Sequence, residues 1–586
     1  MSVRETSANG ASHGGDFARH HRLIRLSAFA LVIGVMSTGG AILLLGAIRF
    51  FTNLFFFQTL SLAQRSPADS HLGAWVILVP VIGGLVVGLM ARYGSDKIRG
   101  HGIPEAIEAI LFGKSRMSPK IAILKPLSSG IAIGSGGPFG AEGPIIMTGG
   151  AAASLLAQAF HLTAAERKAL LVAGACAGMT AVFGSPLAAV LLAVELLLFE
   201  LRPRSLLPVT LSCVVAAFLR PLWAGTDALF PLQTQAPGLV AMLSCCVAGL
   251  ASGALSALMT HLLYRVEDFF SRLPLHWMWW PALGGLAVGL GGLMQPRALG
   301  VGYDVIGDLL QHHLLMSAVL GLLLVKSVIW VIALGSGTSG GVLAPLLMIG
   351  AGLGSVLAGW LPGGSPQLWA LVCMAAILAG TMRAPLTAVA FAFELTRDTN
   401  AFLPTLLGCA VAYGFTVMVM PRSILTEKIA RRGRHVYREY GVDPLERHFV
   451  DEVMTRDPVT IAGSLTPGAA LSAYFGQKQQ HRAYPVVTDG QVVGMMDRST
   501  LNDLARDAPA QPLAQRFPAP HDLVYVLPTD SCRSVALKLA AHGLERLPVV
   551  NDPIARELVG IISRSDLLKP ARALHEEEEH RERFFG

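Results

Sequence analysis

The segment Gly134-Ser-Gly-Gly-Pro-Phe-Gly-Ala-Glu142-Gly-Pro144 places one acidic residue inside a long apolar stretch of the chain. Glu142 is the only charged residue between Lys125 and Glu166. An isolated carboxylate at membrane depth costs free energy, and such groups face cavities and mark ion pathways. The surrounding glycines break the apolar run, and Pro144 suits the first turn of a new helix. The segment therefore predicts a helix that begins inside a membrane beside a functional acid. The alternative is a capping glutamate that only fixes the turn.

The rest of the composition is also that of a membrane protein. Of the 586 residues, 53% are hydrophobic and only 15% are charged, and about half of the charged residues lie after Met420. The run from Ser327 to Met382 contains no charge, and about 20 apolar residues are enough for a spanning helix. Glycine and proline interrupt many apolar runs. Irregular backbone at membrane depth must be covered by protein or line a water-filled cavity, so the interruptions predict a transport pathway.

Charge and cysteine patterns exclude other classes of protein. The net charge of +7 comes from basic residues dispersed among hydrophobic segments, so we expect no nucleic-acid partner. The seven cysteines lack ligand spacing, and no metal site is expected.

Residues 1–18 are rich in Ser, Gly and Ala and are predicted to be disordered. Arg19, Arg22 and Arg25 precede the first apolar run and predict a cytoplasmic N-terminus.

An internal repeat divides the apolar part into two halves, residues 26–225 and 235–432. The segment 186–196 matches the segment 385–395 at seven of eleven positions, and both end in Glu-Leu. A looser match places Gly134-Ser135-Gly136 on Gly335-Ser336-Gly337. Duplicated halves with broken helices are typical of transport proteins, whose substrate site lies at the repeat interface. We therefore expect an all-α membrane domain of two inverted repeats with broken, tilted helices.

Three glycine-rich segments are candidate helix starts: Gly100-His-Gly-Ile-Pro104, Gly140-Ala-Glu-Gly-Pro144 and Gly341-Val-Leu-Ala-Pro345. Unpaired amides and the positive end of the dipole at a helix start attract anions. Backbone amides bind an anion weakly enough for rapid release. Each segment taken alone could instead be a close-packing device between helices.

In these segments, from about Arg19 to Arg432, the chain resembles the CLC family of chloride channels and chloride/proton exchangers. The resemblance implies that Glu142 is the gating glutamate, whose carboxylate competes with chloride and moves away or is protonated to open the path. It also implies a homodimer with one anion path in each subunit. The anion-binding residues that it implies lie in the three segments and in a final pore helix: Gly100, His101, Gly102, Ile103, Gly140, Ala141, Gly143, Val342, Leu343, Ala344 and Leu425.

The chain departs from the family pattern in its anion site. His101 replaces the usual serine, Ala141 the usual arginine, and Leu343 the usual aromatic residue. Leu425 stands where the family commonly has a tyrosine that contacts chloride. Either backbone amides carry the site alone or His101 supplies a donor, while His101 could also cap its helix without touching the ion.

A second departure concerns protons. Exchangers of the family usually carry an inner glutamate just after the position of Glu195, and Leu196 stands there. Glu195 and Glu200 are the candidates for a proton path, although for Glu195 we favour a structural role bonded to helix ends, which its repeat partner Glu394 shares. Leu196 favours an uncoupled channel. The alternatives are a chloride/proton antiporter, and a transporter that selects fluoride or another halide.

After Pro421 the composition becomes that of a soluble α+β domain that resembles a pair of CBS domains. A linker at 433–449 is followed by one unit at 450–510, a second at 511–571 and a charged tail at 572–586. Ser563 and Asp566 resemble the element with which such domains hold the ribose of an adenosine nucleotide. The alternative is that the pair of CBS domains only packs against the membrane part or against its twin.

The sequence thus predicts a multi-pass protein of the cell (inner) membrane with cytoplasmic termini, surrounded by lipid, that transports chloride. No catalytic residue and no required cofactor are expected, and a nucleotide is the one further candidate ligand. A CBS-regulated cation transporter is a distant alternative, because cations call for clustered carboxylates that this region lacks. The spacing of His575-Glu576 and His580 does not fit a metalloprotease helix.

Overall fold

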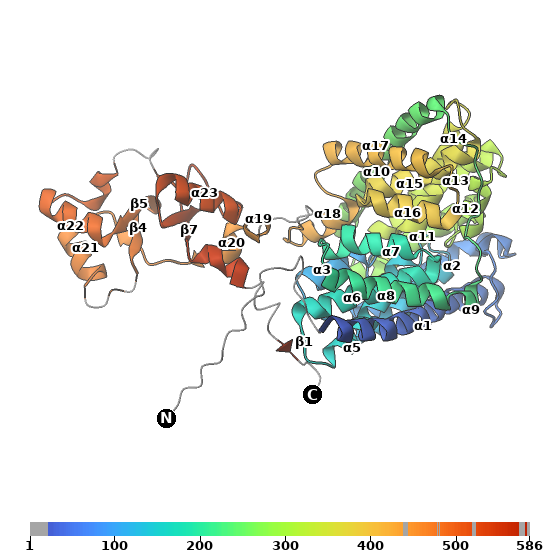
Figure 1. Cartoon of the computed structure of the whole chain (residues 1–586), viewed down its shortest axis with the longest axis horizontal. Coiled ribbons are helices and arrows are strands. Elements are labelled where there is room, and N and C mark those ends of the chain that lie inside the picture. The colour runs from blue at the N-terminus through green and yellow to red at the C-terminus, as the bar shows by residue number, and fades with distance from the viewer. Residues whose placement is uncertain are drawn as a thin grey trace. The chain divides into compact units, whose positions relative to one another are not determined.

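The computed structural model describes residues 22–436, 444–476, 479, 481–517, 523–572 and 581–582. The chain forms two compact units, one that ends at Arg438 and takes in the last residues from Arg581, and one from Glu439 to His580. Figure 1 shows the first as a bundle of helices and the second as a smaller α+β domain. The predicted disordered segment 1–18 lies outside the described residues, as do residues 437–443 of the linker and most of the tail.

The first half of the membrane domain contains short helices among long ones, which confirms the prediction of broken spans. Proline at the first turn begins several of them, and Thr163 caps α6 through a reciprocal contact with Glu166. The helices are α1 (Arg22–Phe57), α2 (Leu78–Tyr93), α3 (Ile103–Leu111), α4 (Pro119–Gly134), α5 (Glu142–Gln158), α6 (Ala164–Phe183), α7 (Pro186–Leu192) with a π-turn at Ala193–Leu198, α8 (Pro203–Leu219) and α9 (Pro221–Ala224).

The second half repeats this order of elements. Its helices are α10 (Leu239–Ser271), α11 (Trp280–Met294), α12 (Tyr303–Leu310), α13 (Met316–Gly335), α14 (Leu343–Leu357), α15 (Pro366–Met382), α16 (Pro385–Thr396) and α17 (Phe402–Val419), followed by α18 (Ile424–Arg431). Short 3-10 turns link the halves' helices at Pro67–Asp69, Gly73–Ile77, Asp96–Ile98, Trp277–Trp279 and Pro296–Ala298.

Two glutamates show how the halves are related. Glu195, at the end of the first repeat segment, accepts hydrogen bonds from the amides of Leu386 (3.1 Å) and Thr387 (2.8 Å) at the start of α16. Glu394 accepts from the amides at the start of α7, at 2.9 and 2.8 Å. Each segment's end therefore meets the other's beginning, so the two segments run antiparallel. A two-fold axis that relates two inverted repeats produces reciprocal contacts of this kind.

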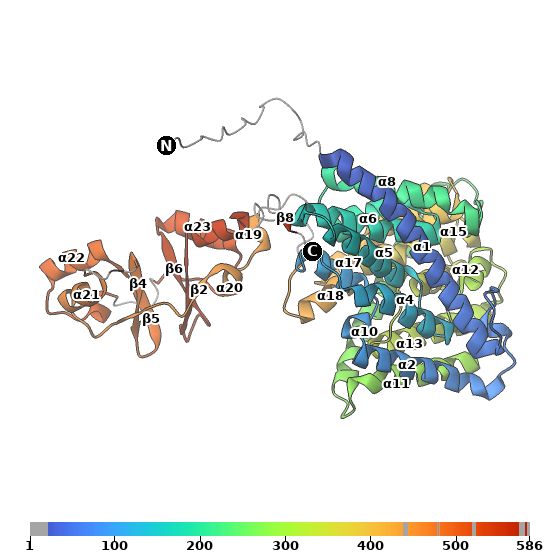
Figure 2. The same ribbon diagram turned by 90° about the horizontal axis from the view of Figure 1, so that it is seen from below.

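The helices that follow the glycine-rich breaks form the centre of the domain. α5 packs on α6, and their repeat counterparts α14 and α15 pack on each other in the same way. Nearly every side chain of α15 is buried. Figure 2 gives a second view of this domain, with the long α1 on its outside beside α8. Six helices among the described residues are long and apolar enough to span a membrane: Leu23–Phe57, Gly73–Tyr93, Pro203–Ala224, Leu239–Ser271, Met316–Gly335 and Phe402–Arg431.

The α+β domain contains two small sheets, one in each predicted unit. β3 (Ile461–Ala462) pairs with β4 (Ala483–Thr488), which pairs with β5 (Gln491–Asp497). β2 (Thr455–Arg456) pairs with β7 (Leu558–Ser563), which pairs with β6 (Arg546–Val550). The helices are α19 (Pro444–Arg447), α20 (Val450–Val453), α21 (Pro467–Tyr474), α22 (Arg498–Asp507) and α23 (Cys532–His542), with 3-10 turns at Leu513–Arg516 and Asp566–Leu568.

The two units of this domain share chain segments. α20 and β2 precede the first sheet but pack with the second, where Val450 lies in the core with Val535. Leu513 lies in the core of the first sheet. The boundary expected at residue 510 therefore falls ahead of the last core residue of the first unit. The tail contributes β8 (Arg581–Glu582), which pairs antiparallel with β1 (Leu162–Thr163) of the membrane domain.

Candidate anion pathway

The three glycine-rich segments, far apart in the sequence, meet at the centre of the membrane domain. Gly140 and Gly341 form an antiparallel bridge, with N–H to O distances of 3.2 and 2.9 Å. Gly100 bridges to Ser339, and its amide donates to the carbonyl of Thr338 at 3.2 Å. The starts of α3, α5 and α14 are therefore held together through their own backbones.

Glycine is required here because the backbones approach more closely than any side chain allows. A Cβ at Gly143 would lie 1.8 Å from the carbonyl oxygen of His101. A Cβ at Gly341 would lie 2.2 Å from Oε2 of Glu142 and 2.6 Å from the carbonyl oxygen of Gly140. Gly102 precedes α3 with φ = 88°, a conformation that only glycine adopts readily. The glycines thus leave amides, rather than side chains, facing the centre.

Glu142 occupies that centre. Its side chain is fully buried, and its Oε1 accepts a hydrogen bond of 2.6 Å from the amide of Ala344 at the start of α14. Its Oε2 has no hydrogen-bond partner among the described residues. The carboxylate of α5 therefore accepts from an amide in the first turn of another helix, which has no partner within that helix and is where a free anion would bind.

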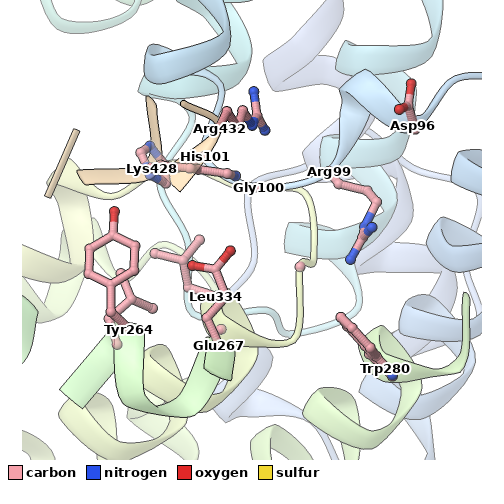
Figure 3. A pocket seen from close by; sticks show the side chains of 13 residues that line it. Asp96, Arg99, Gly100, His101, Tyr264, Glu267, Trp280, Leu334, Lys428 and Arg432 are labelled. Atoms are coloured by element: carbon pink, nitrogen blue, oxygen red, sulfur yellow. The ribbon is translucent and has the colours of Figure 1, made fainter. Parts of the chain in front are cut away.

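His101 lies on one side of this centre and lines a cavity of about 170 Å³. Its side chain is 2% exposed, and its Nδ1 has no partner among the described residues. The cavity is also lined by Lys428 of α18, by Arg432 just after α18, and by Arg99, which extends toward Trp280 (Figure 3). Asp96 and Glu267 line the same cavity, and Lys428 and Arg432 both pair with Glu105, so the cavity wall carries charges of both signs.

Three charged residues that sequence reasoning missed hold the start of α3. Lys125, fully buried on α4, donates to the carbonyls of Ile98 (2.8 Å) and Gly100 (2.9 Å). Glu105 accepts from the amide of Gly102 at 3.0 Å and pairs with Lys428 at 3.1 Å. Glu105 stands three residues after Gly102, which is the capping-box position and the signal that could have identified it.

Comparison with known proteins identifies the family. A model of the voltage gated chloride channel family matches residues 25–417, and the CBS domain matches residues 450–505 and 519–571. The chain belongs to the voltage-gated chloride channel (CLC) family. Members of this family are membrane proteins that carry anions, which agrees with the sequence-based expectation of an anion transporter.

Individual relatives agree with this assignment. The putative chloride channel protein ClcB-like of Ralstonia nicotianae is 30% identical over 366 residues, covering 61% of this chain and 85% of the relative. The voltage-gated ClC-type chloride channel ClcB of Citrobacter koseri is 32% identical over 381 residues, covering 62% and 88%.

Solved structures share the fold. A slow cyanobacterial Cl⁻/H⁺ antiporter superposes with a TM-score of 0.61 at 23% identity, covering 71% of this chain and 99% of that one. A eukaryotic CLC transporter superposes with a TM-score of 0.61 at 19% identity, covering 93% and 98%. At these identities the likeness establishes the fold alone.

The remaining residues that were predicted to bind the anion lie at or beside the starts of the same helices and of α18. Ile103 is the first residue of α3, and Ala141 immediately precedes α5. Val342 immediately precedes α14, and Leu343 is its first residue. Leu425 is buried in the first turn of α18, a helix that packs against α3.

The two candidate proton-path residues are engaged in contacts elsewhere. Glu195 accepts from two amides of α16 and from the hydroxyl of Thr387 at 2.6 Å. Glu200 accepts from Ser205 at 2.7 Å and lies 4.0 Å from Lys168. Leu196, between them in the sequence, is buried. Glu195 therefore caps the start of α16, whereas Glu200 bonds to a hydroxyl in the first turn of α8.

The candidate nucleotide element lies at the end of β7. The hydroxyl of Ser563 donates to Asp566 at 2.6 Å, and the amide of Ser563 donates to the same oxygen at 2.8 Å. Asp566 also pairs with Lys569 at 2.7 Å. The Asp566 carboxylate thus closes the turn after β7 in this structure.

Proposed function

We propose that this CLC protein conducts chloride across the membrane past the starts of α3, α5 and α14, with Glu142 as the gate. The observation that carries the proposal is the bond between the Glu142 carboxylate and the Ala344 amide. An acidic side chain that rests on a helix start excludes a free anion from the same amide. When the side chain is protonated or moves away, the amide becomes available to chloride.

The anion is held mainly by backbone amides in this proposal. Leu343 and Leu425 carry no donor, and Glu142 itself carries charge of the wrong sign. His101 is the one side chain among the predicted anion-site residues that can donate, and its Nδ1 has no hydrogen-bond partner in the described part of the chain. Weak binding by amides suits conduction, because an ion that is held loosely leaves quickly.

We infer uncoupled conduction rather than exchange for protons. Leu196 cannot carry a proton, and both nearby glutamates are bonded to helix ends or to a hydroxyl. Exchange for protons is the alternative, since a structure of the same fold is described as a Cl⁻/H⁺ antiporter. A third structure of this fold, with a TM-score of 0.58 at 21% identity, is described as a fluoride/proton antiporter, so fluoride is the halide alternative.

The surroundings of the protein complete the proposal. We propose that two copies associate in the cell (inner) membrane, each with its own path, and that both termini face the cytoplasm. The α+β domain would then regulate the path from the cytoplasmic side, with an adenosine nucleotide at Ser563 and Asp566 as its candidate ligand.

The test is chloride efflux from liposomes that contain the purified protein. We expect efflux to rise as the pH falls, because protonation of Glu142 removes the competing charge. Glu142→Gln should raise passive efflux and abolish the pH dependence. Unchanged efflux with an unchanged pH response would refute the gate. The reversal potential under opposed chloride and proton gradients separates a channel, which follows chloride alone, from an antiporter.

A further inference from the structure

The start of α12 is the repeat counterpart of the start of α3. The segment Gly300-Val-Gly-Tyr303 aligns with Gly100-His-Gly-Ile103. Lys326 donates to the carbonyls of Ala298 (2.9 Å) and Gly300 (2.8 Å), as Lys125 does in the first half. Gly302 has φ = 76°, close to the 88° of Gly102. The same local structure is therefore built twice.

The packing of the two segments is also equivalent. A Cβ at Gly102 would meet Met147 of α5 at 3.0 Å, and a Cβ at Gly302 would meet Met348 of α14 at 2.2 Å. Because the repeats are inverted, α3 and α12 approach the paired starts of α5 and α14 from opposite sides. His101 therefore flanks the Glu142 carboxylate on one side, and the start of α12 flanks it on the other.

Tyr303, the first residue of α12, brings an unpaired donor to that second side. Its hydroxyl is buried and has no hydrogen-bond partner among the described residues. Its ring centroid lies 6.2 Å from that of Phe183 and 6.3 Å from that of Phe230. The neighbouring aromatic rings cannot accept a hydrogen bond from this hydroxyl as a carboxylate would. A buried hydroxyl without a hydrogen-bond partner costs free energy.

Tyr303 lies against the same helix start as the Glu142 carboxylate, because a Cβ at the neighbouring Gly302 would meet Met348, one helical turn after Ala344 on α14. Oε2 of this carboxylate is likewise buried and unpaired within the described part of the chain. A carboxylate that leaves the Ala344 amide in a water-poor region must find another donor, since an unpaired buried charge is costly. The rings of Phe183 and Phe230 supply no hydrogen-bond donor, whereas the hydroxyl of Tyr303 does.

We propose that the Tyr303 hydroxyl donates a hydrogen bond to the Glu142 carboxylate when the gate leaves the Ala344 amide, and so stabilises the open position. Tyr303 is then a positioning residue for the gate and not an anion ligand. The inference rests on the proposed role of Glu142. It explains why a hydroxyl is retained, without a partner, among phenylalanines in the closed arrangement.

The experiment measures chloride efflux for Tyr303→Phe in two backgrounds, native and Glu142→Ala. We expect efflux to fall about tenfold in the native background, because a hydrogen bond to a charged group is lost in the open state only. We expect no change in the Glu142→Ala background, where no carboxylate needs a donor. Tyr93→Phe, on a side chain that is 81% exposed at the end of α2, is the matched control and should change neither.

Other outcomes overturn the inference in distinguishable ways. An equal fall in both backgrounds would mean that the hydroxyl supports the fold or the anion directly. No fall in either background, with Glu142→Ala still raising efflux, would leave the gate standing and remove Tyr303 from it. If Glu142→Ala itself did not change efflux, the proposed function would fail first. Normal efflux of the double variant shows that Tyr303→Phe folds.

Discussion

Gly140 offers a steric test of whether the Glu142 carboxylate and the anion share one place. A Cβ at Gly140 would lie 2.1 Å from Oε1, 2.0 Å from Oε2 and 2.3 Å from Cδ of Glu142. Carbon and oxygen atoms in ordinary contact are about 3.5 Å apart. An alanine at this position therefore occupies the carboxylate's place. If chloride binds in the same place, the methyl group excludes chloride as well.

The perturbation is Gly140→Ala added to Glu142→Ala. In the single variant the gate is gone and the Ala344 amide, which donates to Oε1 at 2.6 Å, is free for chloride. In the double variant the ion must shift by about 1 Å or more to clear the methyl group and so loses most of that bond. A hydrogen bond to a charged group contributes about 1.5–3 kcal/mol. The efflux should therefore fall about tenfold to a hundredfold from that of Glu142→Ala.

The assay is chloride efflux from liposomes, followed with a chloride electrode at matched protein density. Gly307→Ala in the same background is the control, because a Cβ at Gly307 meets no atom within 4 Å. Equal efflux from Glu142→Ala with and without Gly140→Ala would refute the shared site.

Three further variants test the structure around the path. Lys125→Met leaves the carbonyls of Ile98 and Gly100 without their charged donor, so we expect chloride affinity to weaken about tenfold in calorimetric titration; unchanged affinity would show that this lysine does not position the site. Glu195→Gln should lower the melting temperature, because it weakens the cap on α16, and should leave chloride efflux unchanged. Altered proton movement in a Glu195→Gln variant of normal stability would place Glu195 on a proton path instead. Asp566→Ala should abolish any rise in melting temperature that ATP or AMP produces in the native protein, while a retained rise would locate the nucleotide elsewhere.

The repeat and the broken helices were predictable because their signals are local. Glycines at the start of each central helix, a proline in its first turn and one acid in an uncharged run are all visible in the letters of the sequence. The place of Glu142 on the amide of Ala344 joins residues from two halves of the chain. The family resemblance implied that Glu142 competes with chloride, but the contact with Ala344 was not predicted, and no local pattern could give it.

Lys125, Lys326 and Tyr303 were missed for a physical reason. In the sequence, Lys125 and Lys326 resemble the charged residues that mark the end of an apolar helix. No local pattern shows that each of them donates to two carbonyls from a distant part of the chain. Tyr303 looks like an ordinary aromatic residue beside a glycine. Its position follows only from superposing the second half on the first, with Gly302 in the place of Gly102.

The α+β domain shows a different limit. Its internal repeat indicated two units in chain order, yet β2 pairs with β7 of the second unit. Strand pairing over about a hundred residues depends on tertiary packing rather than on local propensity. The internal repeat alone therefore could not show that β2, which precedes the first sheet, pairs with a strand of the second unit.

The central claim is that the Glu142 carboxylate and a transported anion compete for the amide of Ala344. Crystals grown in bromide test this directly, because anomalous scattering locates the ion without reference to the protein's density. We predict an anomalous peak within hydrogen-bond distance of the Ala344 amide in Glu142→Ala, and none at that place in the native protein at neutral pH. A peak on this amide in both proteins, or in neither, would contradict the competition on which the gate depends.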